Sequence, residues 1–391
     1  MKKFVRYILK TLRNPQFAWW VIHRNIVSTY NEKLGHNAGK KIASLNEPWT
    51  FNTTRLDKHI KNAWISDQPE PTIIVQMAKP EDRLHTAFYG QRWIYHLNDV
   101  VFDPMWEIIT ANGHVLIESI RGSNFSARVS ATILARKKIL RRSKNAKKTI
   151  GYPVTALPIG DSEMFGHFLL NALPKILRCQ TKSQSPLTVL LPPGCAPFVK
   201  DALSAANICY KEVFNPVRCE NYYLAASSYE STEDIYFSDI KNLREMYLKN
   251  LTTSVGLKHK VYATRIGSAR GRIGDYEEQL CRELKAIGFI IFKPGERTFI
   301  EEVKLFKNTS VLVAPTGSGF YNCIWMDSNS LVVEIIDPGI KLDTESETVA
   351  IKAQLNYKCV DISNFSADSV KAASNILHFI QETVLNYNSQ L

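Results

Sequence analysis

Three short apolar runs constrain the fold of this chain more than any other feature. They lie at residues 289–292, 311–314 and 331–336. Runs of this length and composition are typical of strands buried on both faces, as in a parallel sheet. Between the runs, apolar residues recur at helical spacing. Strands that alternate with helices predict βαβ crossovers and therefore a Rossmann-like layer.

The helices between these strands carry their own start and stop signals. Gly288 follows the first amphipathic segment and predicts its C-terminal end. Thr298, with Glu301 three residues later, forms a capping box that predicts the start of the second helix. The apolar face of the first helix repeats at intervals of three or four residues: Tyr276, Leu280, Leu284 and Ile287.

A glycine-rich turn follows the 311–314 strand. It consists of Thr316, Gly317, Ser318 and Gly319. Such a turn between a strand and a helix allows backbone N–H groups to approach a phosphate, although a tight turn without a ligand has the same appearance. Three arginines follow the strand predicted at 261–264, so they should lie near the same sheet edge, and they favour an anionic, diphosphate-like ligand: Arg265, Arg270 and Arg272.

Residues 264–335 resemble the C-terminal half of glycosyltransferase family 61, a family that includes capsular polysaccharide biosynthesis proteins. The resemblance covers roughly residues 95–360 and departs from the family pattern at Thr316, usually histidine, and at Glu302, usually glutamine. A second motif, Gly-His-Phe followed by Leu-Pro, is matched at 166–174. The matching residues of the C-terminal half are Arg265, Arg272, Gly288, Phe289, Glu301, Gly317, Gly319, Asn322 and Glu334.

The resemblance implies a GT-B-like α/β fold, in which two Rossmann-like domains face a cleft. It also implies an inverting sugar transfer from a nucleotide-sugar donor to a glycan acceptor, in capsular or other cell-surface polysaccharide synthesis. The acceptor could also be a lipid-linked glycan. The three arginines and residues 316–319 would bind the donor diphosphate, with Asn322 beside them and Glu334 on the ribose. His167 or Asp161 would remove the acceptor proton. No DxD-like motif stands in a suitable place, so a metal-free reaction without a cofactor is expected.

Charge is distributed unevenly along the chain. Residues 1–150 contain 25 Lys or Arg and 11 Asp or Glu, a net charge of +14; the other 241 residues contain 24 and 26, a net of −2, and together these give +12. The segment 1–27 is basic and amphipathic, contains Trp19 and Trp20, and has no apolar run of membrane-spanning length. With the basic run 136–148, it predicts a peripheral contact with an anionic membrane surface. No aromatic residues interleave this run, which speaks against nucleic acid.

Three domains are expected: a basic N-terminal extension (1–70), an acceptor-side α/β domain (71–250) and a nucleotide-sugar-binding domain (251–391). In the second of these, 72–76 and 93–97 are predicted strands, and Asn112-Gly113 predicts a hairpin. Seven scattered cysteines without metal-like spacing indicate reduced thiols and a cytoplasmic location. The peripheral contact expected from the basic segments would then be with the inner face of the membrane.

Two other functions fit parts of the pattern. An NAD-dependent oxidoreductase would need GxGxxG after a first strand, and this chain has only Thr-Gly-Ser-Gly after a late one. A catalytically inactive membrane-surface scaffold that keeps the glycosyltransferase fold is the second alternative, and the departure at Thr316 favours it. Binding and hydrolysis of nucleotide sugars would separate these functions.

Overall fold

The fold is described from a computed structural model. It describes residues 42–43, 60–67, 92–116, 119, 137–157, 164–225, 235–249, 251, 258–266, 276–336, 345–362 and 369–389, with the backbone alone for 42–43, 60, 62–67 and 92–93. The chain divides into two compact units. The first comprises residues 1–71 and 87–234, and the second comprises 72–86 and 235–391.

The second unit is built on a wholly parallel sheet in the order β14-β13-β15-β16-β17. Numbered along the chain, this is the 2-1-3-4-5 order of doubly wound α/β folds, so the predicted Rossmann-like layer is confirmed here. The predicted apolar runs form β14, β15 and β16, and each strand is bounded as follows: β13 (His259–Ala263), β14 (Phe289–Phe292), β15 (Thr309–Pro315), β16 (Leu331–Ile336) and β17 (Asn356–Asp361).

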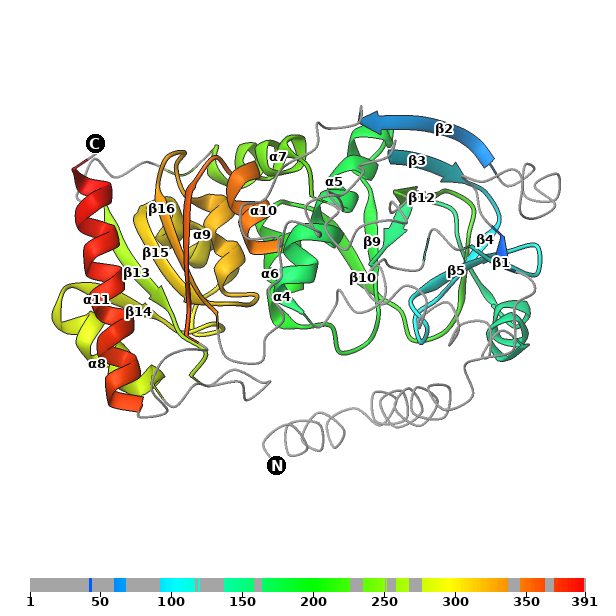
Figure 1. The fold of residues 1–391 in the computed structure, drawn as a ribbon. Helices are drawn as coiled ribbons and strands as arrows, with labels where there is room; N and C mark the ends of the chain where they lie inside the picture. Colours follow the sequence, from blue (N-terminus) through cyan, green and yellow to red (C-terminus); the bar gives the residue numbers. More distant parts are fainter. Residues whose placement is uncertain are drawn as a thin grey trace. The chain divides into compact units, whose positions relative to one another are not determined.

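Helices cover both faces of this sheet (Figure 1). On one face, α8 (Glu277–Ala286) and α11 (Ser369–Asn388) close a core that includes Leu280, Val333 and Ile376, all less than 2% exposed. The other face carries α7 (Phe237–Leu248), α9 (Phe299–Lys307), the 3₁₀ turn η6 (Phe320–Trp325) and α10 (Glu345–Lys352).

The local signals in this unit work as predicted. Thr298 and Glu301 form the capping box of α9, because the Thr298 backbone N–H donates to Glu301 Oε2 over 2.8 Å. Gly288 ends α8 with a φ of +87°, which a side chain would strain. The end of α8 and the start of α9 are therefore set by residues recognisable in the sequence.

The first unit contains two stacked sheets. The larger α/β part has the order β10-β9-β8-β12-β3-β2, in which β10, β9, β8 and β12 are parallel and the last two strands antiparallel. Its elements are β2 (Ile60–Asp67), β3 (Arg92–Leu97), β8 (Val154–Ala156), α4 (Phe165–His167), the π-helical turn η5 (Phe168–Ala172), α5 (Leu173–Lys182), β9 (Thr188–Leu191), α6 (Pro197–Ala205), β10 (Cys209–Glu212) and β12 (Tyr222–Ala225).

The other sheet of this unit is mostly antiparallel and was not predicted. Its order is β1-β6-β5-β4-β11-β7, and a common core that includes Leu97, Phe102 and Tyr222 lies between the two sheets. The expected hairpin at Asn112-Gly113 is present, with φ values of +46° and +76° that suit a type I′ turn. The strands are β1 (Ile42–Ala43), β4 (Val100–Asp103), β5 (Ile108–Ala111), β6 (His114–Leu116), β7 (Lys148–Ile150) and β11 (Val217–Cys219).

The strand expected at 72–76 and the segment 1–27 lie outside the described residues. The boundary expected at residue 250 would place α7 in the first of the two α/β domains. In the structure, α7 belongs to the second unit, which resumes at residue 235. The first unit is a mixed α/β structure in which parallel strands make up only part of the sheets. Among the helices that the structure describes, none is long and apolar enough to cross a bilayer.

Candidate functional site

The candidate site lies at the carboxyl edge of the parallel sheet of the second unit. The strand order reverses at β13, which pairs with β14 on one side and β15 on the other. The loops that leave β13 and β15 therefore diverge, and this is where open α/β sheets bind ligands. Arg265 leaves β13 at this edge, and the turn from Thr316 to Gly319 leaves β15 beside it.

The structure brings Arg265 and the glycine turn into contact. Gly317 has a φ of +145°, and a Cβ atom added there would lie 3.0 Å from a terminal nitrogen of the Arg265 guanidinium. A side chain at this position would therefore displace the arginine as well as strain the backbone. Gly319 is less restricted, since its Cβ would meet Ala263 at 3.7 Å, an ordinary contact.

A buried carboxylate that the sequence analysis missed supports Arg265 from behind. Glu277, the first residue of α8, is 0% exposed, and its Oε1 accepts hydrogen bonds from the Arg265 backbone N–H (2.7 Å), the Thr264 hydroxyl (2.8 Å) and the Tyr262 hydroxyl (3.0 Å). Burial, and then the charge of Glu277, raise the pKa of Tyr262 well above its ordinary value. Glutamate at the first turn of a helix is the only sequence signal for this arrangement.

The other predicted donor residues differ in their surroundings. The Thr316 backbone N–H donates to the Ile335 carbonyl over 2.9 Å, which continues the ladder between β15 and β16, while Ser318 is exposed. Asn322 lies in η6 directly after the turn, is 2% exposed, and hydrogen-bonds through its side chain to Glu302 on α9. The turn thus has a rigid strand on one side and a buried polar contact behind it.

Glu334 is buried within the unit. Its Oε1 accepts a hydrogen bond from the Ser346 hydroxyl at 2.7 Å, and its Oε2 accepts one from the Tyr357 hydroxyl at 2.6 Å. Both carboxylate oxygens therefore join β16 to α10 and β17. The prediction that Glu334 holds the ribose stays a prediction, and these contacts favour an internal role for the residue.

The predicted base belongs to the first unit. His167 is half-buried at the end of α4, and the helix continues from Phe168 as the π-helical turn η5. Turns of this kind are frequent at functional sites, and the sequence carried no signal for it. Four residues after His167, Asn171 is 3% exposed, and its Nδ2 has no hydrogen-bond partner among the described residues. Asp161 lies outside the described residues, as do Arg270 and Arg272.

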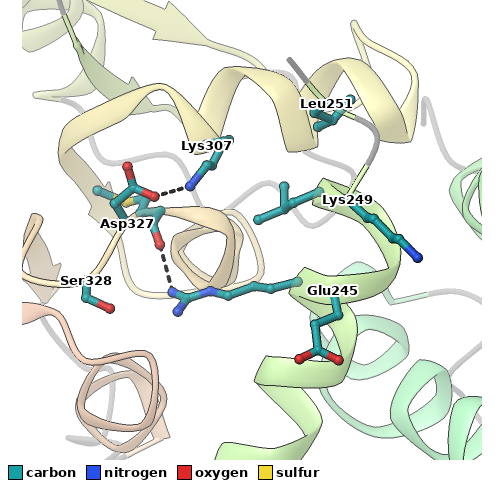
Figure 2. A pocket seen from close by; sticks show the side chains of 9 residues that line it. Glu245, Lys249, Leu251, Lys307, Asp327 and Ser328 are labelled. Carbon is teal, nitrogen blue, oxygen red and sulfur yellow. Dashed lines mark hydrogen bonds and ion pairs between the residues drawn. The ribbon is translucent and has the colours of Figure 1, made fainter. Parts of the chain in front are cut away.

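A cavity of about 710 Å³ lies elsewhere in the second unit, among residues that precede β13, β15 and β16 (Figure 2). Asp327, on its wall, forms ion pairs with Lys258 and Lys307. Although burial favours the neutral acid, the hydrogen bonds from these lysines lower the pKa of Asp327. The paired charges of Asp327 and Lys307 therefore line this cavity, which lies away from the carboxyl edge.

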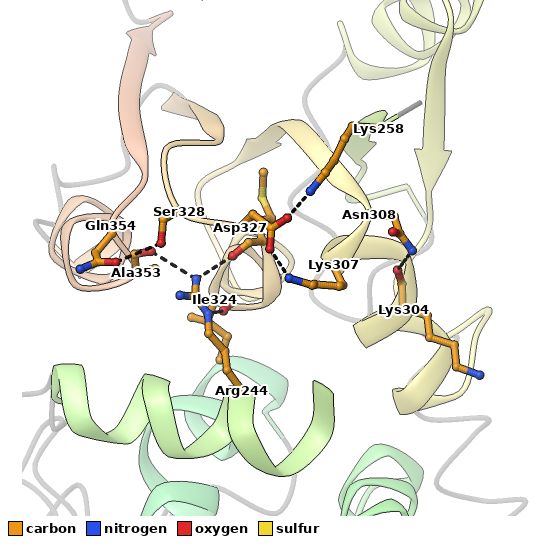
Figure 3. Close-up of polar contacts among 11 residues, drawn as sticks. Arg244, Lys258, Lys304, Lys307, Asn308, Ile324, Asp327, Ser328, Ala353 and Gln354 are labelled. Carbon is orange, nitrogen blue, oxygen red and sulfur yellow. Dashed lines mark hydrogen bonds and ion pairs between the residues drawn. The ribbon is translucent and has the colours of Figure 1, made fainter. Parts of the chain in front are cut away.

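Arg244 on α7 closes one side of this cavity (Figure 3). Its guanidinium donates to the Ile324 carbonyl at 2.6 Å, the Met326 carbonyl at 2.7 Å and the Ala353 carbonyl at 3.2 Å. Arginine bonded to carbonyls at the ends of η6 and α10 has a structural role. In the described part of the chain, no three His, Cys, Asp or Glu side chains gather as a metal site would require.

Comparison with known proteins identifies a matching family model and similar solved structures. Residues 165–333 match the family model described as Glycosyltransferase 61. Among solved structures, the chain is similar to the crystal structure of the bacterial iron-containing dodecameric glycosyltransferase TibC from enterotoxigenic E. coli H10407, with a TM-score of 0.28 and 14% sequence identity. That match covers 51% of this chain and 61% of the TibC chain, less than two thirds of it. No curated protein matches.

Proposed function

We propose, because residues 165–333 match the family model described as Glycosyltransferase 61, that this chain transfers a sugar from a nucleotide-sugar donor to a glycan acceptor. The proposed transfer proceeds with inversion and without a metal, in the synthesis of capsular or other cell-surface polysaccharide. We further propose a GT-B-like division of roles. The parallel sheet of the second unit binds the donor, and the first unit binds the acceptor. The observation that carries it is the contact between Arg265 and Gly317 at the switch point of the sheet.

The donor diphosphate is the chemical reason for this arrangement. When the sugar leaves, negative charge develops on the nucleoside diphosphate, and fixed donors at that point lower the barrier. Arg265 supplies a permanent charge, and the backbone N–H groups of the turn supply hydrogen bonds without reorganisation. Arg270 and Arg272 complete the proposed set. Asn322 would support the turn from below, since its side chain is buried.

The acceptor hydroxyl must lose its proton as its oxygen attacks the anomeric carbon. We assign this proton to His167, with Asp161 as the second candidate base. In the balanced step, the new bond joins the acceptor oxygen to the sugar, the bond to the diphosphate breaks with its electron pair, and the proton passes to the base.

The donor site predicts a specific loss of affinity. Arg265→Ala should weaken binding of nucleoside diphosphates by about 1.5–3 kcal/mol, the range for hydrogen bonds to charged groups. Arg282→Ala is a matched control, since Arg282 is exposed on α8 and donates to Gln279. Titration calorimetry with UDP, GDP and ADP measures the difference. Equal affinities of the two folded variants would contradict the proposed donor site.

The inactive scaffold is kept as a second candidate because of Thr316. Where family members usually have histidine, this threonine is bound through its N–H to the Ile335 carbonyl, and its hydroxyl lies 3.4 Å from the same oxygen. A scaffold would bind no nucleotide sugar, or would bind one without transferring or hydrolysing it. Incubation with a panel of nucleotide sugars, followed by detection of released nucleoside diphosphate, separates the two candidates.

Peripheral membrane binding is proposed from the charge of the first unit. Between residues 137 and 148, which include a described helix at 137–144 and the start of β7, the lysines and arginines that are exposed are Lys137, Lys138, Arg141, Lys144, Lys147 and Lys148. Each basic residue near an anionic surface contributes about 1 kcal/mol. A soluble donor could then meet an acceptor held at the bilayer.

This membrane proposal predicts that replacing Lys147 and Lys148 by Gln weakens binding to anionic vesicles by about 2 kcal/mol. The same replacement at Lys241 and Lys285, which are exposed on the second unit, should have no comparable effect. Co-sedimentation with vesicles of phosphatidylserine and phosphatidylcholine, at low and high salt, measures both. Equal binding to neutral vesicles, or equal loss in both variants, would refute it.

A further inference from the structure

A single carboxylate oxygen ties the end of β13 to the start of α8. Glu277 is 0% exposed, and its Oε1 accepts three hydrogen bonds from the end of this strand and the residue after it. The donors are the Arg265 backbone N–H at 2.7 Å, the Thr264 hydroxyl at 2.8 Å and the Tyr262 hydroxyl at 3.0 Å. The place where the chain leaves the sheet is therefore attached to this oxygen.

Thr264 extends the attachment by one residue along the chain. While its hydroxyl donates to Glu277, its Oγ1 accepts a hydrogen bond from the Ile266 backbone N–H at 3.0 Å. The Thr264 backbone N–H donates to the Phe292 carbonyl at 3.0 Å, which continues the ladder between β13 and β14. Each backbone N–H from Thr264 to Ile266 thus has a partner, and the backbone on both sides of Arg265 is held in one conformation.

The Arg265 side chain starts from the middle of this held segment. A Cβ atom added at Gly317 would lie 3.0 Å from a terminal nitrogen of the guanidinium, 3.6 Å from Nε and 3.7 Å from Cζ. Three atoms of the planar group at similar distances indicate that it lies along the glycine turn. A guanidinium presents its donors in a rigid fork, so its fit to a diphosphate depends on its orientation.

The charge of Glu277 does not explain its position. A carboxylate repels a bound diphosphate, and the exposed neighbour Glu278 already supplies a negative charge to the first turn of α8. Glu277 Oε2 has no hydrogen-bond partner in the part of the chain that the structure describes, so the contacts with β13 and Arg265 all use Oε1. An uncharged acceptor in the place of Oε1 would make the same contacts.

We propose that Glu277 is a positioning residue of the donor site. By accepting the Arg265 backbone N–H and the Thr264 hydroxyl, it fixes the backbone from which the Arg265 guanidinium reaches the turn at Gly317. This inference rests on the proposed function for its link to the donor diphosphate. The role is geometric, so it needs the acceptor oxygen and does not need the charge.

The first test is titration calorimetry of the folded full-length variants with inorganic pyrophosphate and with UDP. Glu277→Gln should bind within about 3-fold of the wild type or more tightly, because the amide oxygen still accepts and the negative charge is gone. Glu277→Ala also lacks the charge but has no acceptor, so Glu277→Gln should bind about 3–10-fold more tightly than Glu277→Ala, the effect of a hydrogen bond. Glu278→Ala, which removes the exposed charge beside it, should follow the wild type.

A double-mutant cycle separates positioning from general support of the fold. A residue that acts through Arg265 has nothing left to position when that side chain is absent. In the Arg265→Ala background, Glu277→Gln and Glu277→Ala should therefore bind pyrophosphate equally. The same 3–10-fold difference in both backgrounds would show that Glu277 stabilises the sheet edge as a whole, and would overturn the proposal.

A second variant covers the case in which Glu277→Ala does not fold. Thr264→Val nearly keeps the shape of the side chain but removes the hydroxyl that donates to Glu277 and accepts from the Ile266 N–H. It should weaken pyrophosphate binding by about 2–10-fold, and this effect should also disappear in the Arg265→Ala background. Wild-type affinity in Thr264→Val, or equal affinities of Glu277→Ala and Glu277→Gln, would count against the positioning role.

Hydrogen exchange of the full chain without ligand gives a readout that needs no donor. The amides of Arg265 and Ile266 should lose about 2–10-fold of their protection in Glu277→Ala and keep it in Glu277→Gln. Residues 280–286 of α8 should be protected equally in both variants. A similar loss of protection throughout α8 in Glu277→Ala would mean that the glutamate only stabilises its own helix.

The two proposals fail in different ways. If neither pyrophosphate nor UDP binds the wild type but the exchange pattern is as expected, the proposed donor site is wrong and Glu277 still positions Arg265. If Arg265→Ala weakens binding while the alanine and glutamine variants of Glu277 bind equally, the donor site stands and the positioning role is wrong.

Discussion

His167→Ala should lower turnover by about 10²–10⁴-fold, the usual contribution of a general base, while donor affinity stays nearly unchanged. The reason is the division of the proposed chemistry between the units. His167 lies on the first unit, and the residues proposed for the diphosphate lie on the second. A base acts on the acceptor hydroxyl and contributes little to donor binding.

A matched control and two separate measurements sharpen this prediction. His378→Ala is the matched control, because His378 is exposed on α11 and paired with Glu382. Single-turnover kinetics and calorimetry on the same samples separate the chemical step from donor binding. Unchanged turnover in His167→Ala together with inactivity of Asp161→Ala would transfer the role of base to Asp161. Loss of the folded state in both variants would mean that His167 is structural.

The π-helical turn gives His167 a second test. Phe168 to Ala172 are all buried, so the turn is held by the core while His167 remains half-exposed at its start. Asn171→Ala removes a buried amide whose Nδ2 has no partner in the described residues. We therefore expect it to lower the free energy of unfolding less than most core substitutions do. If the acceptor binds that amide, the variant should instead lose acceptor affinity. A fall in acceptor affinity in a stable Asn171→Ala protein would therefore place the acceptor beside His167.

Local signals predicted much of the second unit. The capping box at Thr298, the stop at Gly288 and the apolar runs each act through residues close in sequence, and helix and strand boundaries follow from them. The contact between Arg265 and Gly317 was also predictable, because both follow parallel strands that end at the same sheet edge. Parallel topology turns distant residues into neighbours by a simple rule.

The residues that the sequence analysis missed act through long-range contacts. Glu277 supports Arg265 only because α8 starts beside the end of β13, and Arg244 caps η6 and α10 from a helix far away in the sequence. Glu302 was noted only as a departure from the family pattern. Glutamate in a helix is usually solvated, so burial of these carboxylates had no signal in the sequence. The antiparallel sheet of the first unit was missed for the same reason, since its strands are short and pair across long intervals.

The helix α7 shows how a domain boundary is decided by packing. Its sequence gives an amphipathic face and no sign of which core that face will join. In the structure the Tyr247 ring lies 5.0 Å from the Phe299 ring and 5.6 Å from the Trp325 ring, centroid to centroid, with interplanar angles of 62° and 74°. Edge-to-face pairs of this kind add about 0.5–1.5 kcal/mol beyond the area that they bury. Arg244, one turn earlier, adds its three carbonyl contacts.

Tyr247→Ala should therefore destabilise the second unit by about 3–5 kcal/mol, the range for removing a large buried aromatic side chain. Tyr247 is 3% exposed, so the substitution leaves a cavity against Phe299 and Trp325. The neighbouring Met246 is 37% exposed, and Met246→Ala on the same helix is the matched control, with an expected change within about 0.5 kcal/mol.

Native-state hydrogen exchange measures this effect unit by unit, which matters because a chain of two units need not unfold in one step. Peptides from β13 to β17 should lose protection in Tyr247→Ala, whereas peptides from β8 to β12 should keep theirs. The opposite pattern, with protection lost in the first unit and kept in the second, would show that α7 stabilises the first unit, as the boundary expected near residue 250 requires. Since Phe299 and Trp325, whose rings contact Tyr247, belong to the second unit, the first pattern is the one that the packing supports.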